Sequence, residues 1–336
     1  MKTLRHSLLL VLCFITVITL SHCSDDGNDD MMEEEFVDLS DPNALTDALA
    51  VTGATVVVGT PPAPSTDPAA PSISDPDDAF GVQGGELQLG LDLTSGDASG
   101  VYLQIPGADS YFDIPASAFT SGRGVGDEPQ FSLALPDNIE PGEFCVDLCV
   151  YDAENRVSNI VRVCITVGEL GGANSEFLVG IWNVTKIVNV YDGMTETEVI
   201  GEEQVETYNE SIVCADGQTF EEVEITESET TDFIMLTFSA NGALRLQSDG
   251  ETTYLDYQNS TCEDIQYTTE TYSDDWDGAW SYEDGIKRLV LILNAIEDGE
   301  EDQEVVDLTI SVNGNTMTAV QDYGDGEVDT ITLVKQ

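Results

Sequence analysis

Basic residues are scarce in this chain. Among 336 residues there are 10 Lys and Arg against 65 Asp and Glu, which gives a formal net charge of −55. Nucleic-acid binding needs a basic stripe that displaces counterions from phosphates, and docking on anionic lipid headgroups needs a similar patch. The composition argues against both functions. Hydrophobic residues still make up 41% of the chain, which is enough to form buried cores.

Histidine is also nearly absent, since the chain has only His6 and His22. Both lie in a segment that would be lost if it is a signal peptide. The remaining chain would then lack the histidine on which Ser-His-Asp and Cys-His nucleophiles and His-ligated zinc sites depend. The sequence also shows no glycine-rich phosphate loop and no nucleophile motif. We therefore expect a protein that is not an enzyme, and we predict no cofactor and no metal site.

The N-terminus has the pattern of an export signal. Two basic residues precede an apolar run at residues 8–20, which is too short to span a bilayer as a helix. The run leads into Leu-Ser-His-Cys, ending at Cys23, which resembles the lipobox of bacterial lipoproteins. The resemblance implies that residues 1–22 are a signal peptide and that Cys23 carries acyl chains. An ordinary secretory signal, with Cys23 incidental, is the alternative.

The residues after the lipobox add a second resemblance. Ser24-Asp25-Asp26 is similar to the signal that sends surface lipoproteins of the Bacteroidota to the outer leaflet of the outer membrane. The resemblance implies a lipid-anchored outer-membrane protein that is exposed on the cell surface, with the membrane as its partner through the anchor.

Residues 23–80 have the composition of a tether. No Lys or Arg occurs between Arg5 and Arg123, and the many acidic residues repel one another. Six prolines lie within residues 59–78, a density typical of a semi-rigid spacer. We expect a disordered, acidic and Pro-rich tether with at most a short helical turn at residues 42–50.

Residues 81–170 predict an immunoglobulin-like β-sandwich. Short alternating strands are separated by Gly, Pro, Asp and Asn every 8–12 positions. About seven such strands in under about 100 residues are typical of that fold. The segment 140–152 resembles the penultimate strand of bacterial immunoglobulin-like modules.

The last two strands of this region form a hairpin whose register follows from their apolar faces. With a loop of two or four residues centred on residues 154–155, Cys145 lies opposite Cys164 and Asp147 lies opposite Arg162. Opposed strand residues have β-carbons about 4.5–5.5 Å apart, close enough for a disulfide. The register therefore predicts a Cys145–Cys164 disulfide in an oxidising compartment.

Residues 176–336 predict an up-and-down β-barrel, because strands follow one another through hairpins without a long helix. The turns are Asn241-Gly242, Asn313-Gly314 and Asp325-Gly326. A three-residue loop at the first turn pairs Phe238 with Leu244, and a two-residue turn at the second pairs Ile310 with Met317.

The two ends of this region carry a family resemblance. It opens on Leu178-Val179-Gly180-Ile181-Trp182 and closes on Thr330-Ile331-Thr332-Leu333, which resemble the ends of lipocalin-like modules in Bacteroidota lipoproteins. In lipocalins a basic side chain of the last strand covers the Trp, so the resemblance implies structural roles for Gly180, Trp182 and Lys335. A frayed terminus that leaves Trp182 packed in the core is the alternative.

The chain has seven cysteines. Cys214 and Cys262 are the only two in the barrel region, so we expect them to form a second disulfide. Cys149 is left over, and it is predicted to be an inert, half-buried thiol opposite Ile160 or, alternatively, a reactive free thiol.

Two further binding sites are weighed against simpler interpretations. Residues 273–284 partly match the calcium loop of EF-hands, but their first and twelfth positions depart from the pattern, so a solvated acidic loop is the simpler interpretation. The segment also has the pattern of a strand, with Trp276 and Trp280 projecting to the same side. Three aromatic residues could line a sugar-binding face or pack in the core: Trp276, Trp280 and Tyr282.

Together these features predict an all-β protein with an immunoglobulin-like sandwich followed by a lipocalin-like barrel. The expected function is a cell-surface binding module that captures a small apolar or amphipathic ligand in the barrel. The alternative is a structural or adhesive surface protein that binds glycan or protein without an internal ligand. The acidity suits either a saline habitat or a cationic partner.

Overall fold

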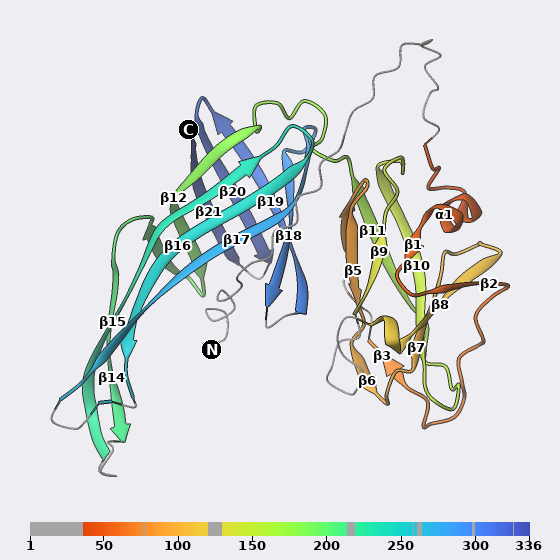
Figure 1. The fold of residues 1–336 in the computed structure, drawn as a ribbon, viewed down its shortest axis with the longest axis horizontal. Coiled ribbons are helices and arrows are strands. Elements are labelled where there is room, and N and C mark those ends of the chain that lie inside the picture. Colours follow the sequence, from red (N-terminus) through yellow and green to blue (C-terminus); the bar gives the residue numbers. More distant parts are fainter. Residues whose placement is uncertain are drawn as a thin grey trace, which may run out of the picture. The chain divides into compact units, whose positions relative to one another are not determined.

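The computed structural model describes residues 36–74, 76, 78–119, 130–213, 219–257, 259–260, 264–297, 300–324 and 326–336. The described chain forms two compact units, one ending at Leu170 and the other beginning at Gly171. Antiparallel strands dominate both units, which confirms the predicted all-β class (Figure 1). Each unit has its own hydrophobic core.

The first unit is a β-sandwich. Its main sheet has six strands in the order β2-β8-β7-β10-β11-β4, and further sheets have the order β1-β9-β5 and β3-β6. The elements are α1 (Pro42–Ala48), β1 (Ala50–Val51), β2 (Thr55–Val58), β3 (Ser72–Ile73), β4 (Ala79–Val82), β5 (Glu86–Gly90), β6 (Leu93–Ser95), β7 (Gly100–Gln104), β8 (Ser110–Pro115), a 3-10 turn (Ala116–Ala118), β9 (Gln130–Ala134), β10 (Gly142–Tyr151) and β11 (Val161–Gly168).

Period-two alternation builds the sandwich core. Along β11, Val161, Val163, Ile165 and Val167 are buried, while the residues between them face outward. Phe131 of the three-stranded sheet is buried in the same cluster. Side chains of the two sheets therefore share one core.

The predicted tether is wrong for the described residues before β5, because α1 and β1–β4 belong to the sandwich. Asp41 caps α1 by accepting hydrogen bonds of 3.1 Å from the backbone N–H groups of Asn43 and Ala44. Leu45 is fully buried in the core. The apolar residues scattered among the acidic ones suffice for folding once distant strands cover them.

The Pro-rich stretch also contacts the sandwich. The N–H of Gly59 donates to the carbonyl of Asp109 at 2.8 Å, and the N–H of Ser65 donates to the carbonyl of Val157 at 2.9 Å. A proline lacks a backbone donor but fits an extended segment that packs beside a sheet. Residues 23–35 of the predicted tether lie outside the described residues.

The β10–β11 hairpin confirms the predicted pairs, since Cys145 lies opposite Cys164 and Asp147 lies opposite Arg162. The predicted loop length is wrong. The N–H of Asp152 donates to the carbonyl of Arg156 at 3.2 Å, which leaves a three-residue loop.

An irregularity in the second strand of this hairpin restores the register. Near the loop, the N–H of Ser158 donates to the carbonyl of Val150. Further along the ladder, Leu148 lies opposite Val161. Three residue steps on one strand thus match two on the other, as in a β-bulge at residues 159–160. The three-residue loop shifts the strand pairing by one residue, and the extra residue in the bulge shifts it back.

The second unit is an antiparallel barrel closed by eight strands, β12 and β15 to β21. Residues Gly180 to Asn183 of β12 close it by pairing with β15, while β12 also pairs with β21. The strands are β12 (Gly180–Tyr191), β13 (Met194–Val199), β14 (Gln204–Val213), β15 (Thr219–Phe238), β16 (Ala243–Leu255), β17 (Tyr267–Glu283), β18 (Arg288–Glu297), β19 (Glu300–Asn313), β20 (Thr316–Gly324) and β21 (Glu327–Lys335).

The barrel wall separates at one end. The second half of β12 leaves β15 and pairs with β13, and the first half of β15 pairs with β14. Figure 1 shows β14, β15, β16 and β17 running beyond the barrel as a long ribbon. We call this end the splayed end, and the end at Gly180 the closed end.

Two predicted hairpin registers in the barrel have different outcomes. Phe238 pairs with Leu244, as predicted. The prediction for the later hairpin is wrong by two residues, because Ile310 pairs with Ala319 rather than with Met317. Gly314, with φ of 62°, takes the first central position of the turn, a place where positive φ favours glycine. A shift of two keeps every side chain on its predicted face.

Candidate functional site: the barrel interior

The closed end is sealed around Trp182, which is fully buried. Its Nε1 donates to the carbonyl of Leu178 at 2.7 Å. The Nζ of Lys335 lies 5.4 Å from the centre of the Trp182 ring and donates to the carbonyl of Phe177 at 2.7 Å. The predicted contact between Lys335 and Trp182 is therefore confirmed. This contact attaches β21, the last strand of the barrel, to the start of β12, its first strand.

Large side chains fill the barrel next to this end. Trp280 is fully buried, and its ring meets that of Phe238 edge to face at 5.4 Å between centres. Tyr282 is buried and meets Phe177 in the same way at 5.3 Å. Trp276 is half-buried against this cluster. The core-packing interpretation holds for these aromatic residues.

The interior changes character along β17. The inward positions run from Trp280 through Gly278 and Trp276 to Asp274 and Tyr272, because alternate residues of a strand share a face. A carboxylate and a phenol thus follow the aromatic residues on one wall. The alternation of side chains along a strand could have shown this transition in the sequence. Asp and Glu are so common in this chain, however, that a single acidic residue does not stand out as a site residue.

Among the described residues of the barrel, Asp274 is the buried carboxylate, with 7% of its surface exposed. Ser248 of β16 donates a hydrogen bond of 3.1 Å to its Oδ2. Burial raises the pKa of the Asp274 carboxyl because it disfavours the charged form, while the bond from Ser248 acts in the opposite direction.

A hydrogen-bonded group lies further toward the splayed end. Thr231 donates to Oε1 of Glu198 at 2.7 Å, and its hydroxyl lies 3.1 Å from that of Tyr272. Burial raises the pKa of the Tyr272 phenol. These residues come from β13, β15 and β17, so the group spans the place where the wall separates.

Two more tyrosine–carboxylate pairs lie at this end of the barrel. Tyr191 donates to Oε1 of Glu196 at 2.7 Å, and Tyr323 donates to Oδ2 of Asp329 at 3.0 Å. Burial, followed by the bond to Asp329, raises the pKa of Tyr323. The splayed end is therefore lined by hydroxyl and carboxylate groups.

Few cations belong to the strands at this end. β13, β14, β15 and β17 contain no Lys or Arg, whereas β12 carries Lys186, which is exposed where β12 pairs with β13. Arg245 is the basic residue of β16, and it pairs on the outer face with Asp275, with its Nε 2.6 Å from Oδ1. The arrangement suits a ligand that carries hydroxyl groups or positive charge.

Neither the suggested calcium loop nor the solvated acidic loop forms. Residues 267–283 make one continuous strand, β17, in which Asp274 and Asp275 point to opposite faces. An EF-hand site needs its oxygens to converge around a tight turn. The extended backbone keeps them apart.

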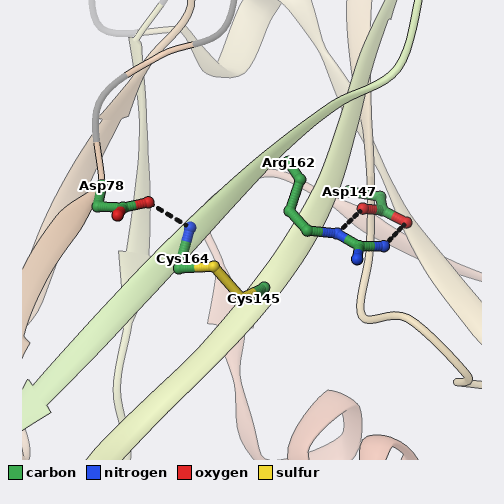
Figure 2. The surroundings of a disulfide bond; sticks show 5 residues. All are labelled: Asp78, Cys145, Asp147, Arg162 and Cys164. Carbon is green, nitrogen blue, oxygen red and sulfur yellow. Dashed lines mark hydrogen bonds and ion pairs between the residues drawn. A yellow bond between two sulfur atoms is a disulfide. The ribbon is translucent and has the colours of Figure 1, made fainter.

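The Cys145–Cys164 disulfide is present, as predicted. Figure 2 shows it beside the Asp147–Arg162 pair, in which Nε and Oδ1 are 2.7 Å apart, and beside Asp78, which accepts a hydrogen bond of 3.1 Å from the N–H of Cys164. Among the described residues, the one group with metal-ligand spacing combines this disulfide with Glu143. Disulfide sulfurs lack the thiolate that binds metals.

Cys149 is a free thiol with 2% of its surface exposed. It lies opposite Tyr102 of β7. On the other side the regular β10–β11 ladder ends at Leu148 and Val161, so the predicted position opposite Ile160 falls in the bulge at residues 159–160. Burial raises the pKa of this thiol to about 12, with Asp147 adding to the effect. The inert-thiol interpretation agrees with this environment.

Three predicted site residues lie outside the described residues: Cys23, Cys214 and Cys262. In the described part of the chain, no helix is long and apolar enough to cross a membrane. Neither family models nor curated proteins give a match to this sequence.

Proposed function

We propose that this protein is a lipid-anchored binding module of the outer-membrane surface, similar to Bacteroidota lipoproteins, whose barrel takes a small amphipathic ligand at its splayed end. The observation that carries the ligand proposal is the change along the interior of β17 from Trp280 to Asp274 and Tyr272. Because aromatic side chains fill the closed end, the apolar part of a ligand would reach only as far as Trp276. A binding rather than catalytic role agrees with the absence of histidine after residue 22.

The polar group of the ligand would carry positive charge or hydroxyl groups. Glu198, Asp274 and Tyr272 offer acceptors in a partly buried setting, where electrostatic interactions are stronger than in water. An anionic ligand would meet repulsion from the carboxylates of Glu198 and Asp274. The charge of the ligand head therefore tests the proposal directly.

Trp276 provides an intrinsic reporter for the experiment. Dodecylamine and dodecanoate, titrated below their micellar concentrations, share an apolar tail and differ in charge. We expect dodecylamine to change the tryptophan fluorescence and to bind at least about tenfold more tightly, a difference of about 1.4 kcal/mol. Glu198→Gln should reduce that preference, and Asp275→Asn on the outer face should leave it unchanged. Equal binding of both probes would show that the site has no such selectivity.

The anchor is tested separately. Cys23→Ser should release the protein from membranes, because acyl chains are the proposed hold on lipid. Membrane fractionation and palmitate labelling give the readout, and protease accessibility on intact cells tests surface exposure. Labelling that survives the substitution would contradict the lipobox assignment.

Adhesion to a glycan or protein is a second candidate function. Tyr257 and Tyr267, near the β16–β17 end of the ribbon, are 58% and 40% exposed. Exposed aromatic rings are a common contact for sugars and proteins. Loss of adhesion in a Tyr257→Ser/Tyr267→Ser variant with unchanged dodecylamine binding would assign that role to the ribbon.

A further inference from the structure

One stretch of this acidic chain has no charge at all. Residues 48–66 contain no Asp, Glu, Lys or Arg, although the chain has 65 acidic residues. Strand β2 lies at the centre of this stretch, with the sequence Thr-Val-Val-Val. The uncharged stretch is therefore part of the folded sandwich.

β2 is an exposed edge strand. It stands first in the order of the six-stranded sheet and pairs only with β8 in the described part of the chain. Val56 is 54% exposed and Val58 is 88% exposed. Natural edge strands are commonly protected by charges, prolines or bulges, because a bare edge is a template for another strand. β2 has none of these within its four residues.

The backbone of β2 offers its hydrogen-bonding groups in a defined pattern. The N–H of Gly59 donates to the carbonyl of Asp109 at 2.8 Å, which marks this pair as hydrogen-bonded across the ladder to β8. Hydrogen-bonded pairs recur at every second residue of an antiparallel ladder, so Thr55 and Val57 also point their groups toward β8. Val56 and Val58 consequently direct their N–H and C=O groups away from β8, toward the free edge.

We propose that β2 pairs with β2 of a second copy of this chain, antiparallel and around a two-fold axis at Val57. In this register Val56 lies opposite Val58 of the second copy, and Val58 lies opposite its Val56. Both pairs are of the hydrogen-bonded kind, so every free-edge group of the two valines finds a partner. The same contact places the exposed side chains of Val56 and Val58 beside those of the second copy, and it is isologous, as closed dimers require.

The lack of local charge permits a second copy at this edge. Two chains of net charge −55 repel one another, and most surfaces would bring carboxylates together. The uncharged edge lets two copies meet without opposing carboxylates. Because the contact is short, the dimer is weak. Added salt should strengthen it, since screening reduces the repulsion. This inference does not depend on the proposed ligand site.

Sedimentation velocity of the full chain carrying Cys23→Ser, which removes any acyl chain, tests the proposal. We expect a monomer–dimer equilibrium whose Kd falls as NaCl rises from 0.02 to 0.5 M. Val56→Asp should raise the Kd at least tenfold. Val205→Asp is the matched control, because Val205 is 58% exposed on another edge strand, β14, and gains the same charge. Equal effects of the two variants, or a monomer under all conditions, would overturn the proposal.

A backbone test separates strand pairing from a loose apolar contact. Val56→Pro removes an N–H that β8 does not use, so the fold is kept and the dimer should be lost. Circular dichroism and the thermal unfolding midpoint check that the fold is kept. Hydrogen exchange should show the amides of Val56 and Val58 protected at high protein concentration and exposed at low concentration. Rapid exchange at both concentrations would overturn the pairing.

Discussion

At the scale of single residues, Gly180 illustrates how the closed end depends on backbone conformation. Its φ is 130°, a region that residues with a side chain rarely adopt, and an added Cβ would lie 3.0 Å from Cε of Lys335. The glycine therefore allows Lys335 to reach Trp182. The Gly-x-Trp pattern of the sequence marks this need for a residue without a Cβ.

Gly180→Ala should lower the free energy of unfolding by about 1–3 kcal/mol, the usual cost of a strained backbone conformation. Urea unfolding gives the measurement. Gly285→Ala is the control, because no atom lies within 4 Å of its added Cβ and its φ is outside the strained region. A similar loss in both variants would show that Lys335 and the backbone impose no constraint at Gly180.

Asp274 and Asp275 are sequence neighbours with opposite electrostatic settings. Burial raises the pKa of Asp274, so the proton binds more tightly in the folded state than in the unfolded chain. Its favourable contribution is present below the unfolded pKa of about 4 and is lost as pH rises through the folded pKa. The hydrogen bond from Arg245 lowers the pKa of Asp275, whose contribution is present above about pH 4 and is lost as pH falls.

Asp274→Asn should therefore increase stability at pH 7, and its advantage over the wild type should shrink as pH falls toward 4. Asp275→Asn should lose roughly 0.5 kcal/mol at pH 7, because the exposed bridge to Arg245 is partly screened by solvent. Thermal unfolding between pH 4 and 8 gives both profiles. A destabilised Asp274→Asn protein at pH 7 would mean that the charged carboxylate is favoured in the folded state.

At the scale of elements, the β10–β11 hairpin shows two local departures that compensate each other. The loop has three residues, whereas two or four were predicted. The second strand carries an extra residue near Asn159. Asn159 is held there by side-chain hydrogen bonds to the backbone of Ile73, from Nδ2 at 2.8 Å and to Oδ1 at 3.0 Å. A contact with a distant segment thus stabilises the irregularity that restores the Cys145–Cys164 register.

The three cysteines of the sandwich should differ in reactivity. After mild reduction of the folded protein at pH 8, iodoacetamide should label Cys145 and Cys164, which are half-buried, and should spare Cys149, whose pKa is about 12. Peptide mapping before and after denaturation gives the measurement. Without reduction, the 145–164 peptides should remain linked. Rapid labelling of Cys149 in the folded protein would contradict the buried position of this thiol.

At the scale of the whole molecule, net charge dominates the response to solvent. The net charge of −55 destabilises the compact state through self-repulsion, and salt screens this repulsion over a Debye length of about 10 Å at 0.1 M. Several cations of the described chain are already engaged with single carboxylates, including Arg162, Arg245 and Arg288. These pairs leave a large excess of negative charge.

The thermal midpoint should consequently rise as NaCl increases from 0.01 to 1 M, most steeply at low concentration. Scanning calorimetry measures the effect. Tetramethylammonium chloride is the control for specific ion binding, because screening predicts similar curves for the two salts. A flat or falling midpoint would show that self-repulsion contributes little to stability.

Local sequence patterns determined much of this fold. Period-two alternation and turn residues predict strands, and the match of two apolar faces predicts the Cys145–Cys164 and Phe238–Leu244 pairs. The contact of Trp182 with Lys335 is implied by the resemblance of the Gly-x-Trp opening to lipocalin-like modules. The two hairpin pairs depend on residues close together in the sequence, so a single sequence is enough to predict them.

Only the tertiary structure decided the remaining features. Leu45 lies in a segment with the composition of a tether, and its burial depends on strands that lie more than 50 residues away in sequence. Thr231, Glu198 and Tyr272 meet because three strands converge where the barrel wall separates. Composition describes what a segment can do alone, whereas burial and hydrogen bonding depend on which distant segments cover it.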